Sequence, residues 1–285
     1  MKKIELEQGS LEWKEYRRKR IGASEAAVVL GISPWKTPYQ LWEEKISGAE
    51  TAVNAAMQIG SDNEPVARNL FNERWEMNMQ PAVYEADNGW QMASLDGIDG
   101  DFILEIKCGG ARLFVAANNG EIPEYYMAQM QHQMMVTDIK KAFYCCFYEG
   151  EITVCTVDRD DKFIAKLHKA EEEFYNCLQY NEAPPLTDRD YVQFDHPHGS
   201  DLLKQYQAIT AEEKALKAKK DSIKEELLQL GPERNFILDG VKIYQSQNTS
   251  YDFEKMRADG INLNDYKKLS ARYWMINGSS KRKAS

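Results

Sequence analysis

The sequence predicts an α/β protein, in which a mixed α/β domain is followed by a C-terminal extension of one long helix and a hairpin. Three observations predict this class: helical spacing of apolar side chains over most of residues 10–77, short strand patterns over residues 82–158, and a heptad pattern over residues 202–230. The chain has 285 residues and is 43% hydrophobic, so it can bury a full core.

The N-terminal region contains three predicted helix starts. Ser10, Ser24 and Thr37 are each followed by a helical pattern, and a hydroxyl at the N-cap accepts a hydrogen bond from a free first-turn amide. Pro38 at the first helical position and Gln40 at the capping-box position support the third start. The predicted helices run from Ser10 to about residue 20, over residues 26–30, and onward from residue 38.

The central region alternates between strands and helices. Strands are predicted at residues 82–86, 90–97, 102–108, 141–148 and 151–158, and helices at residues 57–77, 123–138 and 160–180. The last two strands form a hairpin around Glu149–Gly150. On the first of these helices Glu64 lies one turn before Arg68, so the two side chains are expected to pair.

A proline-containing connector follows the last of these helices. We therefore predict a domain over residues 1–180, a linker over 181–200 and an extension over 201–285. The heptad of the long helix is interrupted at Glu213 and Lys220, and the helix either pairs with a partner or packs on its own domain. A second hairpin is predicted around Asp239–Gly240. The extension contacts DNA, another copy of the chain or a recombination partner, and the sequence does not decide among them.

Composition limits the classes of function. The net charge is −9, so any contact with nucleic acid must be local, at the basic clusters of residues 14–20, 214–220 or 279–285. The five cysteines are odd in number and lack CxxC spacing, which argues against disulfides and zinc. No signal-peptide pattern follows the two N-terminal lysines and no apolar run approaches 18 residues, so we expect a cytoplasmic protein without a membrane span.

The stretch "SLDGIDGDFILEIKC" at residues 94–108 places acids and a lysine on a predicted hairpin. With a two-residue turn at Asp99–Gly100, side chains alternate between the faces of the sheet. Asp96, Glu105 and Lys107 then share one face, and an odd number of loop residues would remove Asp96 from it.

Two neighbouring carboxylates repel each other, and a hard divalent cation removes that cost. Mg²⁺ binds through one or two carboxylates plus substrate phosphate, and a nearby lysine can orient a water or stabilise phosphate charge. The pattern suits phosphodiester hydrolysis, although a strand with ordinary surface charges gives the same spacing. Glu64 can supply a third carboxylate, and Gln129 an amide that orients water or phosphate.

A set of six ordered motifs resembles the YqaJ-type viral recombinases, which belong with bacteriophage lambda exonuclease in the PD-(D/E)xK nuclease superfamily. The motifs are W-x3-R at Trp13 and Arg17, "IGASEAAVVLGISPW" at 21–35, "GSDNEPVAR" at 60–68, "SLDG" at 94–97, "LEIKC" at 104–108 and "YMAQMQ" at 126–131. The resemblance covers about the first 180 residues. Leu95 stands where the superfamily's name-giving proline precedes the acid, and this should matter little because proline supplies backbone shape and no ligand.

The resemblance implies a restriction-endonuclease-like core, with a central mixed sheet flanked by helices. It implies a Mg²⁺-dependent 5′-to-3′ exonuclease on linear double-stranded DNA ends, with two ions and with Mn²⁺ as a substitute. The product would be a 3′ overhang for a single-strand-annealing recombinase of the Red beta or RecT type. Phage or prophage origin, location in the bacterial cytoplasm and a ring-shaped homotrimer are also implied.

The same resemblance implies roles for individual residues. The metal ligands would be Asp96, Glu105, Glu64 and the backbone carbonyl of Ile106; the remaining catalytic residues would be Lys107 and Gln129; and the 5′-phosphate would be held by Arg17, Ser24 and Ser94. Arg17 is preferred to Arg20 because its distance from Trp13 fits the motif. A phosphate at Ser24 also agrees with the positive end of a helix dipole.

Two other interpretations remain. Another nuclease of the same core, such as a sequence-specific endonuclease or a resolvase, would cut closed circular DNA. A DNA-binding scaffold without catalysis would keep the fold, but loss of chemistry usually replaces a carboxylate or the lysine, and here all four residues (Glu64, Asp96, Glu105, Lys107) are present.

Overall fold

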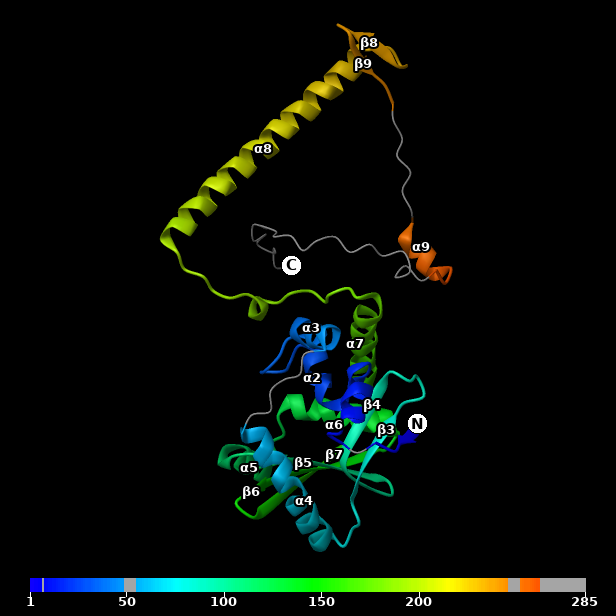
Figure 1. Ribbon diagram of the computed structural model, residues 1–285, viewed down its shortest axis with the longest axis vertical. Helices are drawn as coiled ribbons and strands as arrows, with labels where there is room; N and C mark the ends of the chain where they lie inside the picture. Colours follow the sequence, from blue (N-terminus) through cyan, green and yellow to red (C-terminus); the bar gives the residue numbers. More distant parts are fainter. Residues whose placement is uncertain (7, 49–54, 246–251, 262–285) are drawn as a thin grey trace. The chain divides into compact units, whose positions relative to one another are not determined.

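The computed structural model describes residues 1–6, 8–48, 55–245 and 252–261 (Figure 1). The chain divides into two units, Met1–Tyr191 and Val192–Ser285. The basic tail at residues 279–285 lies outside the described residues. Among the described residues, no helix combines the length and the apolar character needed to span a bilayer.

The first unit is built on a seven-stranded mixed sheet in the order β1-β3-β4-β5-β6-β7, with the short β2 on β4. The strands are β1 Lys2–Ile4, β2 Ile21–Gly22, β3 Gln80–Glu85, β4 Gln91–Asp99, β5 Phe102–Cys108, β6 Lys141–Tyr148 and β7 Glu151–Asp158. The β5–β6 and β2–β4 pairs are parallel and the others antiparallel. The predicted α/β class with a mixed sheet is confirmed.

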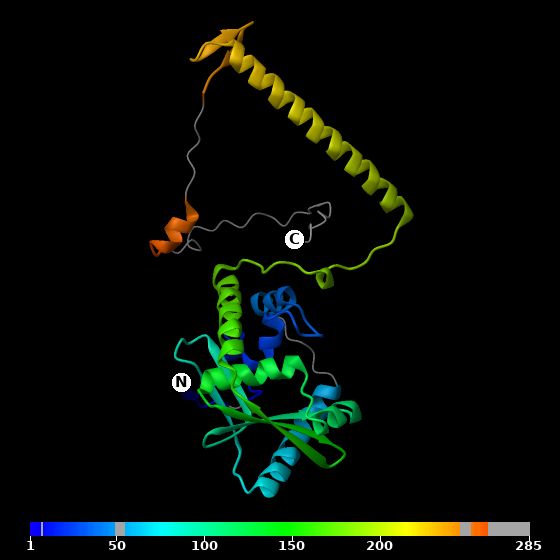
Figure 2. The same ribbon diagram turned by 180° about the vertical axis from the view of Figure 1, so that it is seen from behind.

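Helices lie on both faces of this sheet (Figures 1 and 2). The helices of the first unit are α1 Leu11–Arg18, α2 Ala26–Val29, α3 Pro38–Ser47, α4 Ala55–Trp75, α5 Ala111–Asn118, α6 Glu124–Thr137 and α7 Asp161–Tyr180. Phe71 of α4 packs with Leu104 and Ile106 on one face of β5, whereas Met130 of α6 packs with Ile103 on the other. We call these the α4 face and the α6 face.

Most predicted helix starts are confirmed. Ser10 accepts from the Trp13 amide and Thr37 from the Gln40 amide. The prediction that Ser24 caps a helix is wrong. Ser24 lies inside a 3₁₀ turn, Ala23–Glu25, and the Glu25 carboxylate accepts from the Gly22 amide at 3.0 Å. Because an ionised acceptor is stronger than a hydroxyl, Glu25 organises this turn and leaves the Ser24 hydroxyl exposed.

The β4–β5 hairpin differs from the prediction by one residue. Asp99 pairs with Phe102, so the turn is Gly100–Asp101, and Gly100 has a positive φ of 55°. The loop still has two residues. This keeps the pairing of even with odd positions, so Ile98 and Ile103 lie opposite each other.

A β-bulge on β4 interrupts the alternation from which the face of Asp96 is predicted. The pairing with β3 shifts between Ala82↔Leu95 and Gln80↔Ile98, so two residues of β4 oppose one residue of β3. Leu95 and Ile98 both pack on the α6 face, which breaks the alternation at Asp96 and Gly97. The alternation of side chains along β4 therefore does not determine on which face of the sheet Asp96 lies.

The second unit begins at residue 192. It contains α8 Pro197–Leu230, the hairpin β8 Phe236–Leu238 and β9 Val241–Ile243, and α9 Phe253–Ala258. The helix stops before Gly231–Pro232, and the hairpin turns at Asp239–Gly240, as the sequence predicts.

Candidate active site where strands β4 and β5 separate

Asp96 is held between β4 and β5 at the end of their pairing. Its side chain is 8% exposed, and Oδ2 accepts a hydrogen bond of 2.7 Å from the Ile106 amide. Burial raises the pKa of Asp96 well above its ordinary value, and repulsion from Glu105 and Glu64 raises it further. The bulge therefore directs this carboxyl into the gap between the strands, where other acids approach it.

Glu105 is buried among donors on the α6 face. Gln129 Nε2 donates to Glu105 Oε1 at 2.7 Å, and Gln133 Nε2 donates to Oε2. The two glutamines lie four residues apart on α6, so they emerge on one side of the helix. Packing of Met130 and Met134 in the core fixes α6 over this strand.

Gln133 was not among the residues predicted from the sequence. Its side chain is fully buried, and its Oε1 is a buried acceptor that finds no hydrogen-bond partner among the described residues. The available signal was its position one helical turn after Gln129.

Lys107 lies next to Glu105 on the same side of β5. Its Nζ is 2.5 Å from Glu105 Oε1 and 4.8 Å from the centroid of the Tyr126 ring. Burial alone would lower the pKa of Lys107, but attraction to Glu105 and Asp96 outweighs it and raises that pKa. Lys107 is therefore a cation held beside the two acids, and it is not a neutral base in this state.

Glu64 reaches the same region from α4. The predicted pair with Arg68 is confirmed, with Arg68 Nη2 2.5 Å from Glu64 Oε1. Glu64 also raises the pKa of Asp96, so its charge acts at the site although its own partner is an arginine.

The donor chemistry fits a divalent cation held by two carboxylates. Asp96 and Glu105 are buried acids that repel each other, and a cation between them would remove that repulsion. Across the described parts of the chain, no group of three or more His, Cys, Asp or Glu side chains is arranged to hold a metal. The remaining ligands would have to come from water, a backbone carbonyl or a phosphate, as is usual for Mg²⁺.

Arg17 and Ser24 meet at a second group of polar side chains. Arg17 Nη2 donates to Ser24 Oγ at 2.6 Å and lies 3.2 Å from Glu25 Oε1. Trp13 connects this group to β4, because its Nε1 donates to Ser94 Oγ at 3.0 Å and Arg17 lies 5.2 Å from its ring centroid. Ser94 is thus linked to Arg17 through Trp13, two residues before Asp96.

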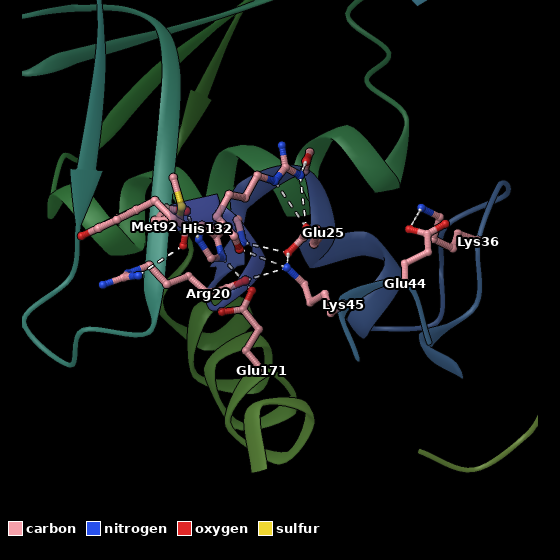
Figure 3. Close-up of polar contacts among 12 residues, drawn as sticks. Arg20, Glu25, Lys36, Glu44, Lys45, Met92, His132 and Glu171 are labelled. Carbon is pink, nitrogen blue, oxygen red and sulfur yellow. Dashed lines mark hydrogen bonds and ion pairs between the residues drawn. The ribbon is translucent and has the colours of Figure 1, made fainter. Parts of the chain in front are cut away.

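Glu25 and Lys45 support Arg17, and sequence reasoning missed both (Figure 3). Lys45 Nζ is 2.9 Å from Glu25 Oε2 and donates to the Arg20 and Arg17 carbonyls at 2.7 and 3.3 Å. Burial opposes ionisation of Glu25, but Lys45 and Arg17 lower its pKa below the ordinary value. Two basic side chains therefore share one buried carboxylate, and burial lowers the pKa of Lys45.

Arg20, the alternative to Arg17, is engaged elsewhere. Its Nε is 2.6 Å from Glu85 Oε2, and its guanidinium lies 3.5 Å from the centroid of the Tyr16 ring. One carboxylate therefore neutralises one guanidinium at Arg20.

A buried network ties α6 to β4 and α7. His132 Nδ1 lies 2.7 Å from Glu171 Oε1, and His132 Nε2 lies 3.0 Å from the Met92 carbonyl (Figure 3). Burial lowers the pKa of His132, but the Glu171 carboxylate outweighs it and raises that pKa. Both ring nitrogens face acceptors, so the protonated imidazolium can donate to both.

Residues 12–140 match the model of the YqaJ-like viral recombinase domain. Over these residues the chain is similar to YqaJ-like viral recombinase domains. The match contains Arg17 through Gln133, which covers both groups of side chains.

A curated relative and a solved structure resemble this chain. Protein YqaJ of Bacillus subtilis strain 168 is 31% identical over 188 residues, which are 62% of this chain and 59% of that protein. The chain thus spans less than two thirds of that relative's length. The alkaline exonuclease LHK-Exo of Laribacter hongkongensis is 24% identical with a TM-score of 0.55, over 61% of this chain and 94% of that one. A crystal structure of LHK-Exo in complex with dAMP gives the same values. This likeness shows that the two proteins share a fold.

Proposed function

We propose that the protein is a divalent-cation-dependent 5′-to-3′ exonuclease that degrades one strand of linear duplex DNA. One observation carries the proposal: two buried carboxylates, Asp96 and Glu105, lie beside the Lys107 ammonium, with Gln129 hydrogen-bonded to the second acid. The YqaJ-like domain and the fold shared with an exonuclease support the same assignment.

The carboxylates of Asp96 and Glu105 would hold Mg²⁺, for which Mn²⁺ would substitute. When bound, the cation supplies charge neutralisation at the scissile phosphate and acidifies water. Glu64 and the Ile106 carbonyl are the proposed further ligands, which would allow two ions. A phosphodiester linked to Mg²⁺ would fill the positions that the described side chains leave open.

The remaining side chains would act on the phosphate and the water. A water oxygen forms the new bond to phosphorus while the bond to the 3′ oxygen breaks, and that oxygen leaves with a proton. Lys107 stabilises the charge that develops on the phosphate oxygens, because the neighbouring acids keep it protonated. Gln129 orients the water, since its amide already lies at Glu105.

Arg17, Ser24 and Ser94 would hold the terminal 5′-phosphate. The Ser24 hydroxyl is exposed next to the Arg17 guanidinium, and the surplus positive charge of Arg17 and Lys45 over Glu25 favours an anion there. Recognition of the 5′ end at this group would place the first phosphodiester at Asp96. The 3′ overhang would then pass to a single-strand-annealing recombinase, and a homotrimer would enclose the duplex.

The decisive experiment compares wild type with Asp96→Asn on linear duplex carrying a 5′-phosphate or a 5′-hydroxyl, in Mg²⁺ or EDTA. We expect metal-dependent loss of the 5′-ended strand, faster with phosphate, and near-complete inactivation of the variant. Cleavage of covalently closed circular DNA would favour an endonuclease or resolvase. DNA binding without cleavage would favour a scaffold, and equal activity of the variant would refute the proposed site.

A further inference from the structure

Trp35 is an exposed tryptophan on a fixed loop between α2 and α3. Its side chain is 66% exposed. The buried Ser33 hydroxyl accepts from the Trp35 amide at 3.3 Å, and Arg189 donates to the Ser33 and Pro34 carbonyls at 2.7 and 3.0 Å. The backbone is therefore held from two sides while the indole remains in solvent.

A row of aromatic rings leads from Trp35 to Lys107. Trp35 makes a T-shaped contact with Tyr125 at 4.8 Å between centroids and lies 6.4 Å from Tyr126. The ammonium of Lys107 lies 4.8 Å from the Tyr126 centroid. One ring thus separates the exposed indole from the proposed catalytic lysine.

We propose that Trp35 is a stacking subsite for a nucleobase of the DNA end, an inference that rests on the proposed exonuclease function. Stacking on an aromatic face tolerates every base, which suits an enzyme that selects ends and not sequences. A fixed indole also loses little conformational freedom when a base stacks on it. The base belongs to a nucleotide adjacent to the phosphodiester at Asp96 and Glu105.

The test is a thermodynamic cycle in which the indole, the base, or both are removed. Wild type and Trp35→Ala are compared, by equilibrium binding in EDTA and by kcat/KM in Mg²⁺, on duplexes with a normal or an abasic nucleotide at one of the first three 5′ positions. We expect Trp35→Ala to weaken binding of normal DNA about 5- to 100-fold, since stacking contributes roughly 1–3 kcal/mol per base. At one of the three positions, the abasic duplex should bind wild type and Trp35→Ala with the same affinity, because the base that stacks on the indole is already missing.

Trp75→Ala is the matched control, because Trp75 is also exposed but stacks on Phe71 at 4.7 Å. Trp75→Ala should bind the normal and the abasic duplexes with the same affinities as wild type. If the losses of affinity from Trp35→Ala and from the abasic nucleotide were additive at every position, the stacking subsite would be overturned and the proposed function would not. The exposed indole would then be assigned to a contact with another protein. Wild type that neither binds nor cuts duplex would overturn the proposed function itself.

The second unit carries an independent observation on α8. This helix has 34 residues, and none is buried. One stripe of aliphatic residues repeats every seven positions and is exposed throughout: Leu202, Ile209, Leu216, Ile223 and Leu230. The positions four residues later complete a coiled-coil seam and are Tyr206, Glu213, Lys220 and Leu227.

The two charged seam positions distinguish the orientations of a pair of helices. In a parallel in-register pair, Glu213 would face Glu213 and Lys220 would face Lys220 of the second copy, which is repulsive. In an antiparallel pair centred near Leu216, Glu212–Glu213 lies alongside the second copy's Lys219–Lys220. We infer that α8 pairs with α8 of a second copy of this chain in antiparallel orientation.

The mass of the full-length chain, measured by sedimentation, tests this pairing. Ile209→Asp with Ile223→Asp should halve the wild-type mass, from two of the proposed homotrimers joined through α8 to one. Leu228→Asp should not, because Leu228 is equally exposed but lies off the stripe. An unchanged mass with the double variant, or a loss of DNA affinity alone, would overturn the pairing.

Charge exchange tests the orientation. Glu212→Lys with Glu213→Lys should raise the dissociation constant at least tenfold, and adding Lys219→Glu with Lys220→Glu should restore it. A parallel pair would be indifferent to the first exchange, since like charges would still face each other, and that result would overturn the antiparallel assignment.

Discussion

The ammonium of Lys107 lies 2.5 Å from Oε1 of Glu105, two residues earlier on the same strand. Gln129 donates to the same carboxylate oxygen, and Gln133 to the other. One ammonium thus neutralises this buried acid, and two amides orient it. This makes Glu105 the most constrained member of the candidate site, and it separates the expected effects of substitutions around it.

Replacing Lys107 should separate hydrolysis from cation binding. Lys107→Gln removes a positive charge next to Asp96 and Glu105, so a divalent cation should bind as tightly as in wild type or more tightly. Hydrolysis should fall by about 10²–10⁴-fold, because the charge that develops on phosphate loses its partner. Calorimetry with Mn²⁺ and single-turnover cleavage measure the two effects. Lys140→Gln, at an exposed lysine beside Asp138, is the control; weaker Mn²⁺ binding by Lys107→Gln would contradict the argument.

The two glutamines on α6 should differ in their effect on stability. Gln133→Ala leaves a buried carboxylate oxygen without its donor, which we expect to lower the free energy of unfolding by about 1–3 kcal/mol in EDTA. Gln129→Ala should lower it less, because Gln129 is half-buried and water can replace its amide. Cleavage should fall about 10- to 100-fold for both, as for partners that orient metal ligands. Urea unfolding provides the comparison, and equal stability of the two variants would contradict it.

The sequence predicts the strands that carry the site better than it predicts the direction of each side chain. Residues 102–108 form a strand with the predicted bounds, because their apolar side chains recur at every second position, as they do on the buried face of a strand. The direction of Asp96 depends on a bulge in the pairing of β4 with β3, and pairing between strands is not encoded in either strand alone.

Contacts between distant segments were also outside the reach of pattern reasoning. The sequence pattern assigns no role to Glu25, and only the approach of Lys45 and Arg17 makes it a buried anchor. Helix α5, Ala111–Asn118, was not predicted at all, since it is short and its burial depends on the sheet beneath it. The Glu64–Arg68 pair was predicted correctly because it is local to one helix.

Selection of a 5′-phosphate should depend on Arg17 and not on Arg20. At Arg17 two cations share Glu25, whereas at Arg20 one guanidinium pairs with Glu85. Arg17→Ala should therefore reduce the ratio of kcat/KM for 5′-phosphate over 5′-hydroxyl ends by about 10- to 100-fold, the range of a charge-assisted hydrogen bond. Arg20→Ala should keep the ratio. The reverse result would move the phosphate site to Arg20.

The His132–Glu171 pair should make stability depend on pH. The pKa of His132 is raised in the folded state, so its contribution is fully present below the unfolded value of about 6.5 and is lost as pH rises through the folded pKa. Urea unfolding of wild type should therefore show a falling free energy above about pH 6.5. Removing one partner of such a buried pair costs about 3–5 kcal/mol.

Glu171→Gln should reverse the direction of this pH dependence. Without the carboxylate, burial lowers the pKa of His132, and stability is lost as pH falls below about 6.5 instead of as it rises. Because His132 Nε2 reaches the Met92 carbonyl, the variant should also loosen α6 over β5 and weaken the hold of Gln129 on Glu105. Hydrogen exchange of α6 amides at pH 6 and pH 8 measures that effect. If the free energy of unfolding had the same pH dependence in wild type and Glu171→Gln, His132 would be neutral in both, and His132 and Glu171 would not form an ion pair.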